Sequence, residues 1–176
     1  SRDILIHDLR DRLPFPDHSF RAVYCSHTLE HLYLDKARNL LRECLRVLRP
    51  GGVLRMVVPD LRAFVENYLR QQGSSWPEDP EGLLSPADRL CWDLQFYRPR
   101  PPSGPLLYRL LLAAFGYHVH CWMYDGDSLV RHFRWAGFAE VKEMPLHRSR
   151  IDGIEQIEEP TRVADGAGVC VEGVKP

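Results

Sequence analysis

Residues 46–60 constrain the fold of this chain more than any other stretch. Helical spacing of apolar residues leads up to Pro50, which cannot continue a helix, and Gly51-Gly52 can adopt the positive φ values of a tight turn. Residues 53–58 are then almost uninterrupted apolar sequence, as is typical of a strand covered on both faces in a parallel sheet. Ligands bind beyond the carboxyl ends of such strands, so Asp60 stands where chemistry is expected.

Strands and helices alternate along the rest of the chain. Short apolar runs predict strands at residues 4–8, 22–26, 53–58, 138–144 and 168–174. Amphipathic spacing predicts helices at residues 35–49, 61–72 and 127–136. We expect Asp35 and Asp60 to cap the first two of these helices. This order, closed by a final strand pair, indicates an α/β sheet with an antiparallel edge.

Residues 73–117 interrupt this pattern. The segment is rich in proline and alternates loop with helix, and Ser85-Pro86-Ala87-Asp88 has the form of a capped helix start. A second helix is expected from about Ser103 to Gly116. We interpret the segment as a helical insertion within one domain spanning residues 1–176, of the kind that shapes a substrate pocket above strand ends.

The composition fits a folded domain without a general attraction to nucleic acid or membranes. The 176 residues are 44% hydrophobic and 27% charged, with a net charge of −1. The five cysteines are scattered, which favours reduced thiols in a cytoplasmic protein over a disulfide framework. Because no apolar run is long enough to span a bilayer, we expect a soluble protein.

Four segments resemble class I S-adenosylmethionine-dependent methyltransferases of the type 11 group. They are Asp8-Leu9 with residues 13–20, Ser26 to Leu32, Glu43 to Gly52, and Trp122 to Asp125 with residues 129–138. In that order they are similar to the end of the family's third strand, the segment after its fourth, the helix and turn before its fifth, and its late helix and sixth strand. The resemblance implies a Rossmann-like methyltransferase sheet.

The sequence departs from the family pattern at its beginning. It contains no Gly-x-Gly-x-Gly loop and no counterpart of the family's first two strands, and Arg21 stands where the family usually has Asp. Strands 4–8 and 22–26 would then lie about 14 Å apart, at about 4.8 Å per strand, with an unpaired edge between them. Three explanations stay open: a fragment of a longer protein, strands supplied by a partner chain or a second copy, or direct packing of the first strand on the second.

The resemblance also implies site residues. Asp8 would bind the adenine amino group of S-adenosylmethionine and Leu9 would pack on its ring, while Ser26 and His27 would line the cleft beside the methyl group. His27 is the candidate catalytic base, because the pKa of an unperturbed histidine lies near neutrality. Glu30 and His31 are expected in a helical turn with structural roles.

A second set of residues is expected to line the pocket for a small-molecule substrate. They are Asp60, His118, His120, Trp122 and Tyr124. His118, His120 and Cys121 also invite comparison with metal ligands, but no third and fourth ligand stand at a typical spacing, so we predict no metal site.

Two functions remain open from the sequence. The first is methyl transfer from S-adenosylmethionine to an acceptor whose reacting atom the sequence does not identify. The second is a degenerate methyltransferase-like module that has lost the cofactor and acts in binding or dimerisation. The missing glycine loop favours the module, whereas Asp8, His27 and Asp60 favour the enzyme.

Overall fold

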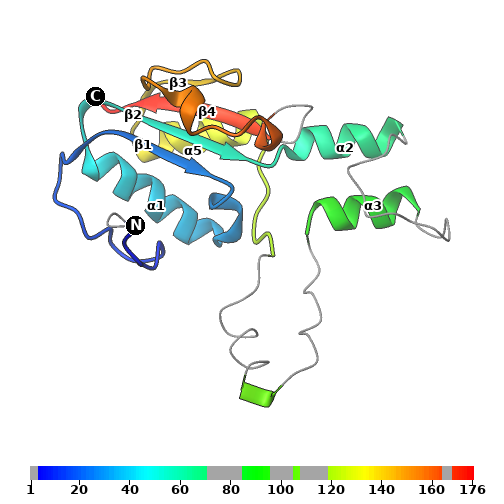
Figure 1. Ribbon diagram of the computed structural model, residues 1–176. Coiled ribbons are helices and arrows are strands. Elements are labelled where there is room, and N and C mark those ends of the chain that lie inside the picture. The colour runs from blue at the N-terminus through cyan, green and yellow to red at the C-terminus, as the bar shows by residue number, and fades with distance from the viewer. Residues whose placement is uncertain (1–3, 71–84, 96–104, 108–118, 164–167) are drawn as a thin grey trace.

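The computed structural model describes residues 4–70, 85–95, 105–107, 119–163 and 168–176. These residues form an open four-stranded sheet with helices (Figure 1). The strands are β1 (Phe20–Ser26), β2 (Leu48–Val58), β3 (Ala139–Glu143) and β4 (Val169–Val174). The mixed α/β architecture predicted from the sequence is confirmed.

The strands lie in the order β1-β2-β4-β3. β1 and β2 are parallel, whereas β4 runs antiparallel to both β2 and β3. The predicted C-terminal strand pair is therefore present, but the antiparallel strand lies inside the sheet and β3 forms the edge. β4 is buried over residues 169–173 because it has strands on both sides, and an edge strand would not be.

The strand predicted at residues 4–8 is absent. That segment has no strand partner among the described residues, and Ile4 and Ile6 are 77% and 95% exposed. An apolar run becomes a strand only when a neighbour pairs with its backbone, and the sheet offers none here. β1 consequently forms the other edge of the sheet, and none of its residues is fully buried.

The helices are α1 (Leu34–Val47), α2 (Leu61–Arg70), α3 (Pro86–Asp93) and α5 (Gly126–Ala136), with short 3-10 turns η1 (Leu29–His31), η2 (Ile154–Gln156) and η3 (Pro160–Arg162). Asp60 accepts a hydrogen bond from the Arg62 amide, as a helix cap should. The cap predicted at Asp35 is wrong, because Asp35 lies inside the first turn of α1 and Tyr33 precedes the helix. α5 is capped by the Asp125 side chain and ends at Gly137, with φ of 107°.

The insertion is described only in part. Ser85 and Asp88 form a reciprocal capping box at the start of α3, with Pro86 at the first helical position, as the sequence predicted. Gly73 and the helix expected from Ser103 to Gly116 lie outside the described residues, apart from the short stretch 105–107.

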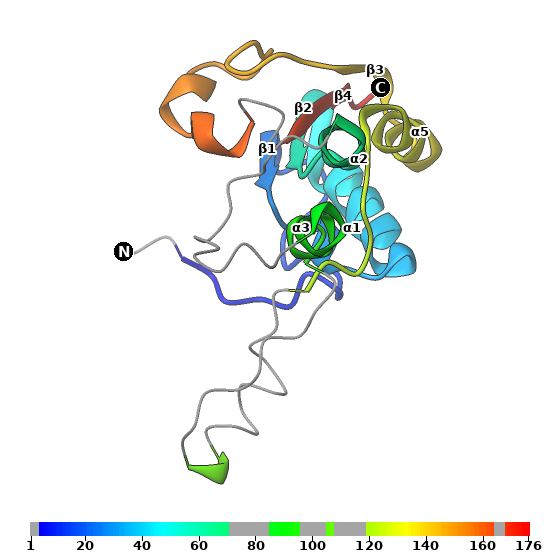
Figure 2. The ribbon, with the colours of Figure 1, turned by 90° about the vertical axis from the view of Figure 1, so that its right-hand side faces the viewer.

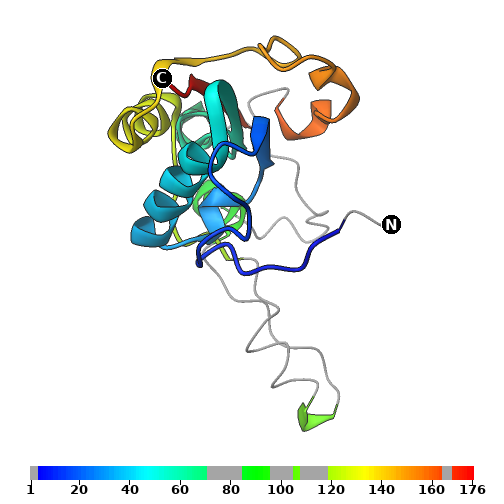
Figure 3. The same ribbon diagram turned by 90° about the vertical axis from the view of Figure 1, so that its left-hand side faces the viewer.

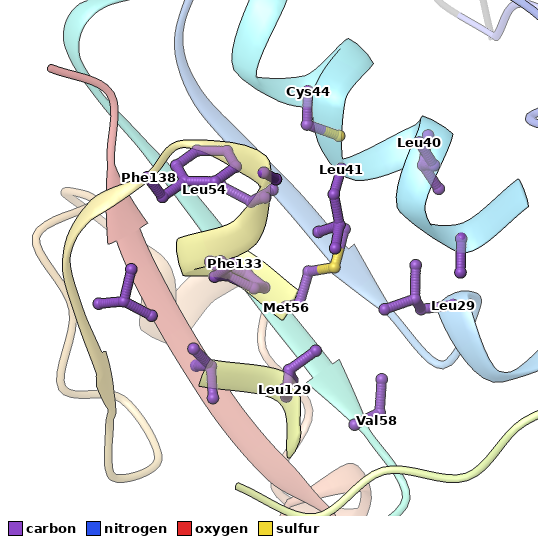
Figure 4. Close-up of a cluster of buried hydrophobic side chains, with 14 of the residues drawn as sticks. Leu29, Leu40, Leu41, Cys44, Leu54, Met56, Val58, Leu129, Phe133 and Phe138 are labelled. Atoms are coloured by element: carbon purple, nitrogen blue, oxygen red, sulfur yellow. The ribbon is translucent and has the colours of Figure 1, made fainter. Parts of the chain in front are cut away.

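One face of the sheet carries the apolar core. α1 and α5 lie on this face, while residues 145–162 lie on the other (Figures 2 and 3). Leu54, Met56 and Val58 of β2 alternate toward the helices, where they meet Leu41 of α1 and Phe133 of α5 (Figure 4). Every one of these side chains is at most 4% exposed.

The opposite face of β2 is held by a buried charged cluster. Arg55 is fully buried and pairs with both oxygens of Glu158, at 2.9 and 2.7 Å, and with Glu172 at 2.8 Å. Its remaining donors bond the carbonyls of Arg148 and Pro145. All five guanidinium N–H groups are thus satisfied, which makes burial of the charge tolerable. We call the side chains of Arg55, Glu158 and Glu172 the Arg55 cluster. This cluster attaches residues 145–158 to the back of the sheet.

The first part of β2 needs its two glycines, Gly51 and Gly52, for different reasons. Gly51 has φ of 77°, which L side chains rarely adopt. Gly52 has an ordinary φ, but a Cβ there would stand 2.8 Å from the Arg49 carbonyl oxygen and 3.1 Å from that of Arg21. Only Gly51 therefore takes the positive φ that the sequence suggested for both.

Replacing Arg55 by methionine should lower the free energy of unfolding by about 3–5 kcal/mol, because Glu158 and Glu172 would stay buried without their cation. Urea denaturation of the two proteins measures the loss. The triple variant Arg55→Met, Glu158→Met, Glu172→Leu is the matched control and should recover most of the stability. A single variant as stable as the wild type would contradict this account of the cluster.

The Arg55 cluster should also make stability depend on acid. Burial alone would raise the pKa of Glu158, but the hydrogen bonds from Arg55 hold it below its ordinary value of 4.5. A carboxylate with a lowered folded-state pKa stabilises the protein above its unfolded pKa and loses that contribution as the pH falls through the folded value. Urea unfolding between pH 6 and about pH 3 should therefore show a steeper loss for the wild type than for the triple variant. Parallel curves of stability against pH for the two proteins would contradict this role of Glu158.

Candidate functional site

The chain turns sharply beyond the carboxyl end of β1. β1 ends at Ser26, and His27 follows in the left-handed conformation with φ of 49°. The His27 amide donates to the Val57 carbonyl at 2.9 Å, which anchors the turn to the end of β2. The buried Ser26 hydroxyl makes no hydrogen bond of ordinary geometry within the described chain. Two residues of the predicted site thus lie at the end of the parallel strand pair, where ligands of such sheets bind.

Glu30, in η1, is the most unusual side chain of this region. It is 1% exposed, and neither carboxylate oxygen makes a hydrogen bond of ordinary geometry with any residue that the structure describes. Burial raises its pKa to about 7. The backbone of Glu30 and Thr28 and the charge of Arg162 offset this effect only in part. A buried carboxyl group with such weak compensation costs stability, and such a cost is typical of functional sites.

The backbone of Glu30 brings a distant segment to the site. Its carbonyl accepts the amides of Cys121, at 2.7 Å, and Trp122, at 3.1 Å. Residues 119–125 therefore run beside η1 (Figure 1). This places the His120 ring 5.2 Å from the His31 ring, centroid to centroid.

Three histidines surround the Glu30 carboxylate. His27 Nδ1 lies 3.6 Å and His31 Nε2 lies 3.9 Å from Glu30 Oε1. One ligand atom each from Glu30, His31 and His120 lies within 4.8 Å of the other two. Burial lowers the pKa of His27, and burial together with the charge of His31 lowers the pKa of His120 to about 4. His27 and His120 are therefore neutral at physiological pH and can accept a proton or bind a metal.

Each of these rings is oriented by a backbone carbonyl on its other side. His27 Nε2 donates to the Arg162 carbonyl and His31 Nδ1 donates to the Val119 carbonyl, both at 3.1 Å. His120 hydrogen-bonds the backbone of Leu94, while its Nδ1 has no partner in the described chain. Since a carbonyl can only accept, the bonded nitrogen of His27 and of His31 carries a hydrogen. The pKa of His27 is lowered, so its opposite nitrogen, Nδ1, keeps a lone pair, 3.6 Å from Glu30 Oε1.

Tyr124 completes this group of residues, and Asp60 lies beside it through the backbone. Asp60 and Tyr124 form a parallel bridge, and the Leu61 amide donates to the Tyr124 carbonyl at 2.8 Å. Tyr124 is 1% exposed, and its hydroxyl has no hydrogen-bond partner among the described residues. Burial raises the pKa of Tyr124, and the charge of Glu30 adds to this. We call Glu30, His27, His31, His120 and Tyr124 the Glu30 cluster.

The remaining predicted site residues are not gathered here. Asp8 is exposed and forms a bidentate ion pair with Arg10, whose hydrogen bonds lower the pKa of Asp8 to about 2. Leu9 packs against the apolar core. Trp122 is 43% exposed, and His118 lies outside the described residues.

Sequence reasoning gave Glu30 and His31 structural roles in a helical turn. The structure adds that Glu30 is 1% exposed and that no lysine or arginine of the described chain forms an ion pair with it. Sequence reasoning also sought partners for His120 in the neighbouring sequence, whereas they come from η1, about 90 residues earlier. The available signal was the spacing of His27, Glu30 and His31 directly after a strand that ends in a parallel sheet.

The comparisons with known proteins agree with this architecture. Residues 2–56 match the family model described as "Methyltransferase domain". A chain from a solved complex between the Haloferax volcanii Trm112 methyltransferase activator and a putative methyltransferase is structurally similar. The alignment covers 98% of the present chain and 61% of that chain, at 16% identity and a TM-score of 0.51. This is the class I methyltransferase fold. The comparisons also support S-adenosylmethionine as the cofactor that goes with this domain.

Two curated relatives match about half of this chain. The Arabidopsis thaliana protein called "Probable methyltransferase PMT3" is 35% identical over 83 residues, or 47% of this chain. "Probable methyltransferase PMT8" from the same plant is 33% identical over 87 residues, or 49% of this chain. Each match covers only 12% of the relative's length. In the described part of this methyltransferase domain, no helix has both the length and the apolarity needed to cross a membrane.

The residues at the end of β1 fit part of a cofactor site. The hydroxyl of Ser26 and the neighbouring His27 stand where the family resemblance places the reacting end of S-adenosylmethionine. Asp8 would have to exchange its Arg10 partner to bind the adenine group. The fit is therefore best at the methyl end, beside the Glu30 cluster.

Replacing Glu30 by methionine should raise the free energy of unfolding in the presence of EDTA by about 1–3 kcal/mol, because a buried and weakly compensated carboxyl group is removed. Urea denaturation measures the change. Glu43→Met is the matched control and should destabilise, because Glu43 accepts hydrogen bonds from Arg46 and the Leu13 amide. A loss of stability in Glu30→Met would mean that Glu30 makes stabilising contacts after all.

Proposed function

We propose that this chain transfers a methyl group from S-adenosylmethionine to a small-molecule acceptor bound over the carboxyl ends of β1 and β2. The observation that carries this proposal is the Glu30 cluster, in which a buried carboxylate and three oriented histidines meet at the end of a parallel strand pair in a methyltransferase fold. Polar groups left without partners at that position are suited to a ligand.

S-adenosylmethionine supplies an electrophilic methyl group with a good leaving group already in place. The chain therefore needs to hold the acceptor in line and, where the acceptor carries a proton, to remove it. Ser26 and His27 would lie beside the methyl group, with Leu9 and Asp8 toward the adenine end. Asp60, Tyr124 and His120 would face the acceptor, with His118 and Trp122 closing the pocket from the segment that precedes α5.

His27 is the proposed catalytic base. Its Nε2–H is held by the Arg162 carbonyl, so Nδ1 is the atom that accepts a proton. Glu30 Oε1 lies 3.6 Å from Nδ1 and would stabilise the imidazolium that forms. This arrangement gives a base oriented on one side and a carboxylate near the other.

Titration of S-adenosylhomocysteine into the purified chain tests cofactor binding directly. We expect a single site with a dissociation constant in the micromolar range. Lys142→Ala, an exposed position on β3, is the control and should bind equally well. A folded chain without binding would contradict the proposal.

His27→Asn should lower the rate of methyl transfer by about 10²–10⁴-fold, since it removes the base. Asparagine is chosen because it tolerates the positive φ of this position. The affinity for S-adenosylhomocysteine should change by only a few-fold, which a general loss of structure would not allow. His18→Asn is the matched control, since His18 also has a positive φ, of 58°, but lies before β1. Equal rates for the two variants would exclude His27 as the base.

A second function has its own support. Asp8 is engaged by Arg10, and β1 presents an edge without a strand partner in the described chain. Such an edge can pair with another chain or a second copy, as in a binding or dimerisation module. Analytical ultracentrifugation separates the functions: a stable dimer that binds no S-adenosylhomocysteine would favour the module over the enzyme.

A further inference from the structure

We infer that the Glu30 cluster is a binding site for one divalent transition metal ion, zinc in preference to magnesium. Its ligands are a Glu30 carboxylate oxygen, His31 Nε2 and His120 Nδ1. The site stands on the positions of these atoms and does not depend on the methyl transfer proposed above.

The set of donor groups suits zinc. Two imidazoles and one carboxylate are a common set for catalytic zinc, which keeps a fourth position open for water or substrate. Imidazole nitrogen suits zinc and neighbouring transition metals, whereas magnesium prefers oxygen ligands. One ligand atom of each residue lies within 4.8 Å of the other two. Tetrahedral bonds of about 2 Å would bring the ligand atoms to about 3.3 Å apart, a shift of the size that side-chain rotation supplies.

The ligand atoms of Glu30 and His120 are buried and poorly satisfied. Both Glu30 oxygens and His120 Nδ1 are buried and make no hydrogen bond of ordinary geometry within the described chain. Glu30 is 1% exposed. Buried polar atoms are nearly always satisfied, so poorly satisfied atoms on two residues whose ligand atoms lie within 4.8 Å of each other favour a cation site over a packing defect.

Backbone groups orient the imidazole rings of His31 and His120. His31 donates its Nδ1–H to the Val119 carbonyl, and His120 bonds the backbone of Leu94. Metal-binding histidines almost always donate their other N–H in this way, which fixes the tautomer and directs the lone pair to the metal. The Glu30 carbonyl in turn holds the 121–122 amides, so both ligand segments are tied together before any metal binds.

The position of the site indicates its use, and this step rests on the proposed function. Beyond the carboxyl end of β1, a metal with an open position would bind an acceptor oxygen or nitrogen and lower its pKa. His27, 3.6 Å from Glu30 Oε1, would then receive the acceptor's proton at Nδ1. The acceptor class is accordingly a metal-chelating molecule with a hydroxyl or amine as the methylated group.

Metal content measures the site independently of activity. The untagged chain is stripped with a chelator, dialysed against zinc chloride, freed of excess metal and analysed by inductively coupled plasma mass spectrometry. We expect one zinc per chain, and about 100-fold weaker zinc binding in Glu30→Gln and His120→Asn. His18→Asn removes a histidine that lies before the start of β1, so this variant should keep the full zinc content.

X-ray absorption at the zinc edge of the wild-type protein covers the case in which a variant fails to fold. Two imidazole ligands and oxygen neighbours at about 2.0–2.1 Å would support the site. Wild-type protein that holds no zinc, a cysteine-rich ligand set, or equal zinc content in His18→Asn and Glu30→Gln would overturn it. Zinc binding without S-adenosylhomocysteine binding would keep the site and reject the proposed function.

Discussion

The burial of β2 on both faces is the constraint on which the rest of the structure depends. Its front face is covered by α1 and α5 through apolar packing, and its back face by the Arg55 cluster. The cluster holds residues 145–158 against the sheet, and the chain continues from there to Arg162. The Arg162 carbonyl then orients His27. A buried ion network on one side of the sheet is thus connected to the orientation of a candidate catalytic residue at its end.

The two buried charged clusters differ in how their charges are compensated. In the Arg55 cluster, every guanidinium N–H has an acceptor, and both carboxylates are paired. In the Glu30 cluster, the nearest histidine nitrogens lie 3.6 and 3.9 Å from the carboxylate, and no lysine or arginine of the described chain forms an ion pair with it. The first arrangement is what structural burial of charge requires. The second leaves buried polar atoms unsatisfied, and its location at the end of parallel strands is where a sheet of this kind binds ligands.

The comparisons and the geometry answer different questions. Family and structural matches place the chain in the class I methyltransferase fold, but the curated relatives match over only 12% of their length and do not identify an acceptor. A fold of this kind supports many reactions, so the function has to be argued from the site. The Glu30 cluster supplies that argument, since it defines which atoms can accept a proton, and which can bind a cation.

The sequence by itself determined the elements and their order. The apolar run of β2 and the helix cap at Asp60 follow from local chemistry, so they could be predicted. The helix predicted to end just before Pro50 ends earlier, at Val47, because residues 48–52 already belong to β2. Local patterns could not show that residues 4–8 lack a strand partner, because pairing is a property of the neighbour.

Only the tertiary structure decided the site. His120 is separated from Glu30 by about 90 residues, and the backbone bonds of the 121–122 amides to the Glu30 carbonyl bring them together. The burial that raises the pKa of Glu30 likewise comes from packing by distant segments. Sequence patterns describe which groups a chain carries, but the distance and the dielectric between two groups exist only once the chain has folded.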